Sequence, residues 1–196
     1  MQPYAHRPYP QHPQPDWRTE HRYTVLTSHP QPRAWLEQAA AHGKKGFSLN
    51  EYLEMADTIQ DLLTGSLAGV EDGLSQLVGR TLAKSLGIQV RRFRAESYPY
   101  PVGTVILGAA CAMAESGYTL KRILQGPDGC LLEGKLAKSW SNHSGSVVCA
   151  VAGTPQHARL HSGIHIPGQL GDLGRCKRIL AALHERVTVY ATAAHA

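Results

Sequence analysis

The segment from Pro101 to Gly117 constrains the fold more than any other, because its sequence predicts an apolar helix with defined ends. Proline suits the first turn of a helix, where a backbone N–H would have no partner, and glycine suits the left-handed position after the last turn. Between these ends, apolar residues recur with a period of 3.6 residues: Val102, Val105, Ile106, Ala109, Ala110 and Met113. Because strand-like segments follow, we expect the helix over residues 101–116 to cover a sheet.

Turn sequences divide residues 118–166 into strand-like segments. The clearest turn is residues 125–129, where proline and glycine supply fixed and left-handed dihedral angles. Residues 157–166 alternate, with one side mainly apolar and the other carrying His157, Arg159, His161, Gly163 and His165. An alternation of period two is typical of a strand with one face against a core. We therefore predict an antiparallel sheet of about four strands in this region.

A second amphipathic segment, residues 172–186, follows the sheet, and Asp172 suits its N-cap. The expected fold class is α+β, with an antiparallel sheet of about four strands (118–166) covered by two helices (101–116 and 172–186). Two further segments, residues 88–95 and 187–192, are strand-like, and the second is expected to add a short final strand.

The chain before the sheet is predicted to be mainly helical and acidic. Residues 48–86 indicate a helical hairpin, whose first helix begins with a capping box of Ser48 and Glu51. Three glycines at four-residue spacing either allow close contact between helices or divide the second helix, and both alternatives stay open: Gly65, Gly69 and Gly73. Upstream, residues 23–27 are expected to form a strand and residues 33–41 a short helix.

The first residues predict a disordered tail, because residues 1–22 are rich in Pro, His, Gln and Tyr and contain few aliphatic side chains. Tyr4, Tyr9 and Trp17 could contact a partner, although a solvated tail is the simpler interpretation. Three parts are therefore expected in the chain: the tail (1–22), a mainly helical acidic segment (23–87) and a basic α+β domain (88–192).

No sequence feature predicts secretion or membrane insertion. The N-terminus lacks the apolar core of a signal peptide, and the longest apolar run, residues 105–114, is too short to span a bilayer. The four cysteines form no C-x-x-C pair, which favours separate buried thiols in a reducing compartment: Cys111, Cys130, Cys149 and Cys176. We therefore expect a cytoplasmic protein without membrane association.

The net charge of +5 is unevenly distributed along the chain. Residues 36–72 contain two basic and seven acidic side chains, whereas residues 73–196 contain fourteen basic and six acidic ones. These opposite charges could meet within the chain, could meet between copies to give a homo-oligomer, or could bind separate partners.

The residues that could carry chemistry do not form a known catalytic pattern. His157, His161 and His165 share one side of the expected strand, but at about 3.3 Å per residue two ligands four residues apart cannot both reach one zinc ion. The chain has no G-x-S-x-G sequence, few carboxylates in its C-terminal half, and no glycine-rich loop that ends in G-K-[S/T]. We therefore predict no catalytic residue, no metal ligand, no cofactor and no enzymatic activity.

Two functions are compatible with this pattern. The first is a non-enzymatic protein–protein interaction or assembly module that binds another protein or a second copy through a sheet edge, the tail and complementary charged faces. The alternative is a nucleic-acid-binding protein that uses a basic sheet and helix face, with Tyr118 and Trp140 available for stacking on bases. The residues predicted to contact nucleic acid are Arg91, Arg92, Arg94, Lys121, Arg122, Arg175, Lys177 and Arg178.

Overall fold

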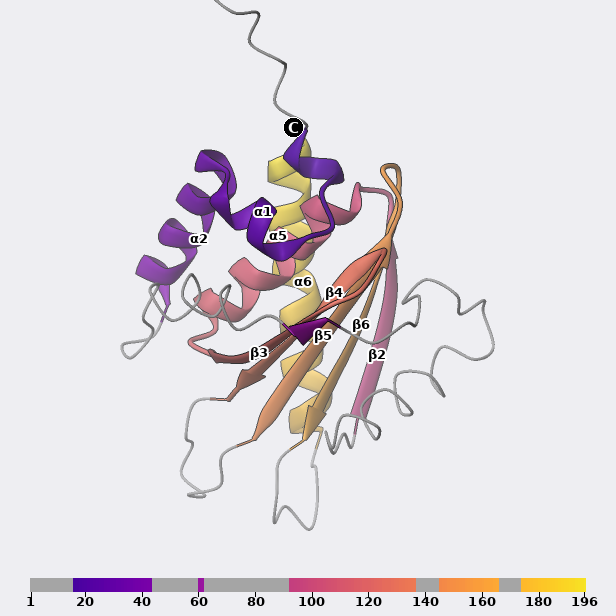
Figure 1. Ribbon diagram of the computed structural model, residues 1–196. Helices are drawn as coiled ribbons and strands as arrows, with labels where there is room; N and C mark the ends of the chain where they lie inside the picture. The colour runs from indigo at the N-terminus through magenta and orange to yellow at the C-terminus, as the bar shows by residue number, and fades with distance from the viewer. Residues whose placement is uncertain (1–15, 44–59, 62–91, 137–144, 166–173) are drawn as a thin grey trace, which may run out of the picture.

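The computed structural model describes residues 16–43, 60–61, 92–136, 145–165 and 174–196. An antiparallel sheet forms its centre, and its strands are β2 (Arg92–Tyr98), β3 (Thr119–Gln125), β4 (Gly129–Lys135), β5 (Ser146–Gly153) and β6 (Ala158–His165). The strand order is β1-β3-β4-β5-β6-β2, where β1 (Gln60–Asp61) is a two-residue strand that pairs in parallel with β3. Strands β3 to β6 are successive neighbours, whereas β2 precedes them in the chain and pairs with the far edge of β6 (Figure 1).

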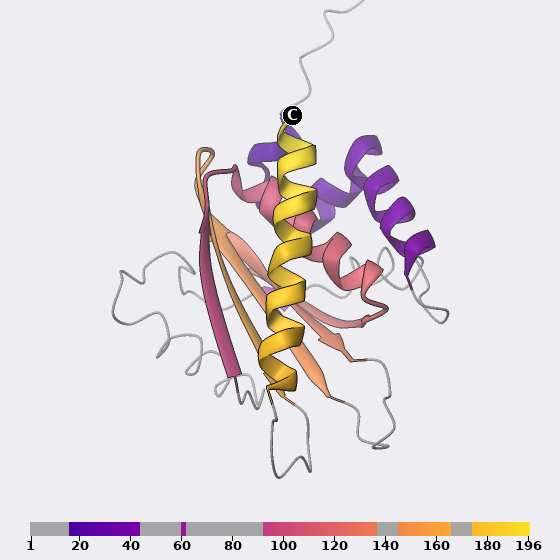
Figure 2. The ribbon, with the colours of Figure 1, turned by 180° about the vertical axis from the view of Figure 1, so that it is seen from behind.

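Two long helices cover one face of this sheet. Helix α5 (Val102–Glu115) contacts β4, β5 and β6, and helix α6 (Arg175–His195) contacts β2 and β6 as well as α5. Figure 2 shows α6 lying lengthwise along the sheet, with α5 crossing beside it. The predicted α+β fold, with helices near residues 101–116 and 172–186 on an antiparallel sheet, is therefore confirmed.

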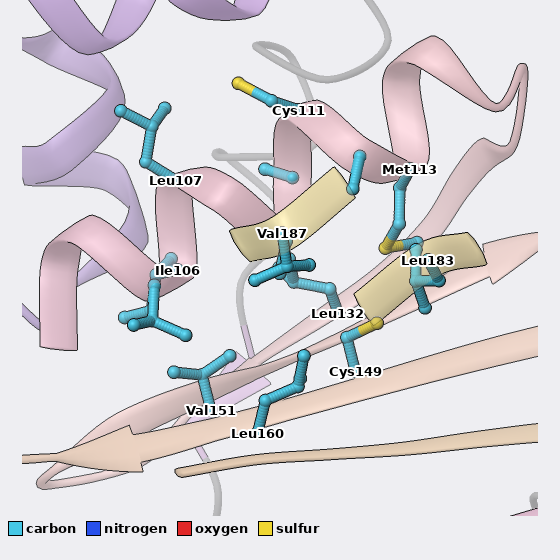
Figure 3. Packing of buried hydrophobic residues seen from close by; sticks show 14 of the residues in the cluster. Ile106, Leu107, Cys111, Met113, Leu132, Cys149, Val151, Leu160, Leu183 and Val187 are labelled. Atoms are coloured by element: carbon cyan, nitrogen blue, oxygen red, sulfur yellow. The ribbon is translucent and has the colours of Figure 1, made fainter. Parts of the chain in front are cut away.

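Helix α5 is the centre of the core, because other elements pack around it on every side. The N-terminal elements η1 (Trp17–Thr19), α1 (Tyr23–Ser28) and α2 (Pro30–His42) all contact it. All thirteen residues from Val102 to Ala114 are buried, which is more than the single apolar stripe of the sequence requires. Figure 3 shows Ile106 and Met113 of α5 in the core with side chains of the sheet and of α6, including Leu132, Cys149, Leu160 and Leu183.

Four segments differ from their predicted structure. Residues 23–27, expected as a strand, form α1, in which Tyr23, Leu26 and Thr27 are buried at helical spacing. Residues 187–192, expected as a strand, continue α6, because Val187 and Ala191 extend the buried stripe of that helix. Tertiary packing outweighs the intrinsic preference for a strand in both segments.

The third difference lies in the predicted tail and is confined to residues 16–22. Trp17 is only 4% exposed, and its indole Nε1 donates a hydrogen bond to Oε1 of Gln31, 3.1 Å away. Residues 1–15 lie outside the described residues. This part of the expected tail therefore belongs to the folded structure, because burial of one large aromatic ring holds it on α5.

Most of the predicted helical hairpin (48–86) lies outside the described residues, as does Asp172, the expected N-cap. The exception is Gln60–Asp61, which pairs with Leu124 and Gln125 as strand β1 where the sequence predicts helix. An edge strand such as β3 presents unpaired backbone groups, and hydrogen bonding to them favours the extended conformation at these two residues. The sheet also contains one antiparallel strand more than predicted, because β2 joins it beside β6.

Candidate functional site

Strand β2 forms an edge of the sheet. Its seven residues pair with β6 from Arg92 opposite Ile164 to Tyr98 opposite Ala158. No other strand in the described ranges pairs with its second edge. Alternate residues of an antiparallel edge strand direct their N–H and C=O groups away from the sheet, where another strand can bind them.

A cavity of about 690 Å³ lies along this edge, between β2 and the start of α6. We call it the β2–α6 groove, and its described lining consists of Arg92, Phe93, Arg94, Ala95, Glu96, Gly174, Lys177 and Leu180. Five consecutive residues of the strand line one wall, and residues of the first turns of α6 line the other. Figure 2 shows that β2 and α6 begin at the same end of the molecule. The fold therefore places the edge strand β2 beside a helix, with a cavity between them.

The charged side chains of β2 project to the side of the sheet that α6 covers. Side chains directly opposite each other in a sheet share a face. Arg94 is paired with Ser162, whose side chain bonds to α6, and Arg92 and Glu96 are two residues away on either side. Nη2 of Arg94 lies 2.9 Å from Oε2 of Glu96, and the side chain of Arg94 is 43% exposed. Among its described residues, the groove is therefore lined by three cationic side chains, counting Lys177, and one carboxylate.

The start of α6 carries charges of the unfavourable sign for helix stability. Its N-cap is Gly174, at φ 73°, which provides no side-chain cap, and its first turn has no acidic residue. Instead, the first four positions include three cations: Arg175, Lys177 and Arg178. The helix dipole makes this end partially positive, and so it favours anions over cations. Intrinsic helix stability therefore does not account for these cations.

A buried polar network lies beneath the groove. Oγ of Ser162 on β6 is 2.6 Å from Nε2 of His184 on α6. Nδ1 of the same imidazole is 3.1 Å from Oε2 of Glu96 and 3.2 Å from the hydroxyl of Tyr98. Burial, together with the nearby charge of Arg94, lowers the pKa of His184 to about 4, so the ring is neutral at pH 7.

These distances match those of a Ser-His-acid catalytic triad, but access to the serine differs. Ser162 and His184 are each only 1% exposed, and Ser162 does not line the groove. A nucleophile must be within reach of the substrate, and here α6 and the sheet enclose it. The network instead connects β2, β6 and α6 through paired buried polar groups, which fixes the helix at a set distance from the strand.

The sequence does not reveal this network, because its members come from three separate segments and form no local motif. One signal was present: His184 interrupts the apolar stripe of α6 between Leu180 and Val187. A polar side chain in such a stripe requires a buried partner. Which partner it has depends on the pairing of β2 with β6, for example Arg94 opposite Ser162, and the sequence does not specify that pairing.

The structure divides the predicted nucleic-acid contacts into two groups. Arg92, Arg94 and Lys177 line the β2–α6 groove, and Arg175 and Arg178 flank it on α6. In contrast, Lys121 and Arg122 lie on β3, four strand spacings or about 19 Å from β2. Both are bound to the buried carboxylate of Glu133, at 2.8 and 2.7 Å. Arg91 and Trp140 lie outside the described residues, and Tyr118 is half-buried away from the groove.

The other candidate groups for chemistry do not converge. On β6, Arg159, His161 and His165 alternate with buried Ala158, Leu160 and Ile164, as the period of two predicts. Within the described ranges, no group of three or more His, Cys, Asp or Glu side chains could hold a metal ion. All four cysteines are buried free thiols, which confirms the prediction of separate thiols.

Comparison of the chain with protein-family models, with curated protein sequences and with solved structures finds no match. Among the helices that the structure describes, none combines the length and the apolar character that crossing a membrane requires. The edge strand β2, the groove beside it and the network beneath it form the candidate site.

Proposed function

We propose that this protein is a non-enzymatic protein-interaction module that binds an extended segment of a partner along β2. The observation that carries the proposal is the combination of an edge strand with a groove whose opposite wall is α6. In this mode of recognition, the partner adds a strand to the sheet, its backbone supplies the hydrogen bonds, and alternate side chains enter the groove. The partner is another protein, and the compartment we propose is the cytoplasm, where buried free thiols stay reduced.

Charged side chains on an edge strand also have a purely protective role, because they discourage aggregation. Arg92 and Arg94 would therefore not support a binding site on their own. The support comes from the space beside them and from the Ser162–His184 contact, which holds α6, the opposite wall of the groove, against the sheet. A preorganised groove reduces the entropy that binding must overcome.

Nucleic-acid binding is the less favoured alternative. The predicted cations do not form one surface, since Lys121 and Arg122 lie at the other side of the sheet and neutralise Glu133. Within the groove, the carboxylate of Glu96 would repel a phosphate backbone. An extended peptide can place a neutral side chain at that position, whereas every nucleotide carries a phosphate.

A fluorescein-labelled peptide of seven residues, matched in length to β2 and consisting of Val except for Asp at two positions i and i+2, tests the proposal. We expect saturable binding in fluorescence anisotropy. Methylation of the backbone nitrogens of one alternate set of peptide residues should abolish binding, whereas methylation of the other set should have little effect, because only one set faces β2. Equal binding of the two methylated peptides would contradict strand addition.

Two further outcomes would also count against the proposal. Tighter binding of a single-stranded oligonucleotide than of the peptide, with the same loss on Arg94→Gln, would favour the nucleic-acid alternative. Covalent labelling of Ser162 by a fluorophosphonate probe would show that substrates reach the buried serine and would favour an enzyme. Light scattering of the protein alone should give the molar mass of a monomer. A dimer that dissociates when salt is added would indicate instead that the edge of β2 binds a second copy of the chain.

A further inference from the structure

We propose that the segment bound along β2 is acidic and places carboxylates at alternate positions facing α6. This inference rests on the proposed strand addition and specifies the chemistry of the partner. It is carried by the arrangement of Arg92, Arg94 and Lys177 around one groove, together with the open edge of β2.

The spacing of the two arginines matches the spacing of side chains on an added strand. Arg92 and Arg94 are two residues apart on the same face of β2, which corresponds to about 6.8 Å along the strand. An added strand has the same repeat, so its side chains at positions i and i+2 face the same side. Two carboxylates at those positions can therefore reach the two guanidinium groups, while Lys177 approaches from the opposite wall.

Arg94 can accept a second carboxylate although it already contacts Glu96. A guanidinium group has five N–H donors, and the hydrogen bonds of Arg94 to Glu96 use its Nε and Nη2 nitrogens. Its side chain is also 43% exposed. An acidic partner would add an ion pair without removing the one that holds Arg94 beside the groove.

The first turn of α6 gives an independent reason to expect an anion. Lys177 is exposed in the first turn of α6, where the helix dipole disfavours cations, and the N-cap residue Gly174 provides no side-chain cap. A carboxylate in the groove would interact favourably with Lys177 and with the positive end of the helix dipole. The same reasoning indicates where acidic residues should be absent, because Glu96 would repel a carboxylate placed beside it.

Three peptides of equal length test this chemistry: a Val peptide with Asp at two positions i and i+2, the same peptide with Asn at both positions, and a permuted peptide with its two Asp residues consecutive. We expect the dissociation constant of the peptide with Asp at i and i+2 to be lower than that of the Asn peptide by a factor of about ten or more, and lower than that of the permuted peptide. The affinity of the first peptide should fall as salt is raised from 50 to 300 mM, because the Debye length, about 10 Å at 0.1 M, shortens over this range and the ion pairs are screened.

Charge-neutralising variants of the protein identify the groove. Lys177→Gln and Arg94→Gln should each weaken binding of the Asp peptide by about threefold to tenfold, because each removes a partly desolvated ion pair. Arg178→Gln is the matched control on the same helix, since Arg178 does not line the groove, and Lys135→Gln on β4 is a second control. Both controls should bind like the unmodified chain, and circular dichroism checks that every variant is folded.

Failure of the inference can be distinguished from failure of the proposed function. If the Asn peptide binds as tightly as the Asp peptide and still depends on which nitrogens are methylated, the acidic partner is wrong and strand addition stands. If Lys177→Gln and Arg178→Gln weaken binding equally, the peptide is bound by non-specific electrostatic attraction and not by the β2–α6 groove. If none of the three peptides binds, both proposals are wrong.

Discussion

Gly103 marks the point where η1 meets the central helix, and its lack of a side chain makes that contact feasible. A Cβ at this position would lie 2.6 Å from the carbonyl oxygen of Glu20 and 2.7 Å from that of Arg18, and closer still to that of Trp17. All three are backbone atoms, so the contact cannot be relieved by a change of rotamer. We expect Gly103→Ala to lower the free energy of unfolding by about 2 kcal/mol or more, measured by urea denaturation.

Gly108 on the same helix supplies the control for this prediction. Its Cβ would lie 3.1 Å from the carbonyl oxygen of Val187 and 3.4 Å from Cγ1 of the same residue, which is a milder contact. Alanine is also favoured over glycine inside a helix by about 1 kcal/mol. Gly108→Ala should therefore change stability much less than Gly103→Ala, and equal losses would contradict the close approach of η1.

His184 should make stability depend on pH. Its pKa is lowered from 6.5 to about 4 by burial and by Arg94, so the unfolded chain binds a proton at a higher pH than the folded chain does. As the pH falls from 6.5 towards 4, the unfolded state is favoured, with a slope of up to about 1.4 kcal/mol per pH unit. Urea denaturation at pH 7, 5.5 and 4.5 measures this loss.

The variant His184→Gln removes the titrating group while keeping polar atoms that can bond to Ser162 and Glu96. We expect a smaller loss of stability between pH 6.5 and 4 than in the unmodified chain. His157→Gln is the matched control, since His157 is exposed and takes no part in this network. His161, whose pKa burial also lowers, accounts for part of the remaining dependence. An unchanged slope in His184→Gln would contradict the assignment.

At the scale of elements, the sequence predicts secondary structure best where a periodic apolar pattern reflects packing against a single neighbouring surface. The alternation along β6 and the stripe of α5 identify both elements, because each follows from one repeating contact with the core. The pattern fails for α1 and for residues 187–192, where β-branched residues favour a strand but packing against α5 stabilises a helix. It also leaves open the neighbours of β2, which depend on pairing between distant segments.

Val189 distinguishes helix from strand in the segment that the sequence assigns wrongly. It is 63% exposed in the C-terminal half of α6, so packing contributes little at this position. In a helix, Val189→Ala should raise the free energy of unfolding by a few tenths of a kcal/mol, whereas Val189→Pro should lower it by about 3 kcal/mol. Urea denaturation of both variants measures these changes. A loss of stability on Val189→Ala would favour a strand instead.

At the scale of the whole molecule, the candidate site could be predicted only in part. The sequence identifies Arg92, Arg94 and Lys177 as cations, but the expected sheet (118–166) does not include β2, which forms the edge that lines the groove. The groove itself requires β2 and α6 to meet, although about 80 residues separate them in the chain. The contact between His184 and Ser162 also depends on the packing of α6 against the sheet. Neither the groove nor this contact therefore has a local sequence motif.

The distribution of the cysteines through the core makes thiol reactivity a probe of the whole fold. Cys111 lies on α5, Cys130 on β4 and Cys149 on β5, and all three are fully buried. Burial raises the pKa of the Cys149 thiol to about 12 and raises the pKa values of Cys111 and Cys130 as well. The reactive thiolate is therefore scarce at pH 8, and the reagent has no access to the sulfur atoms.

We expect these three thiols to resist a disulfide reagent such as dithionitrobenzoate in the native protein and to react together once urea unfolds the chain. Mass spectrometry of the labelled protein should show the fully modified form increasing along the same transition that circular dichroism records, because one core connects the three elements. Cys176, near the exposed start of α6, is the internal comparison and should react first. Modification of Cys149 while the far-ultraviolet signal stays native would mean that the sheet and α5 separate before the fold is lost.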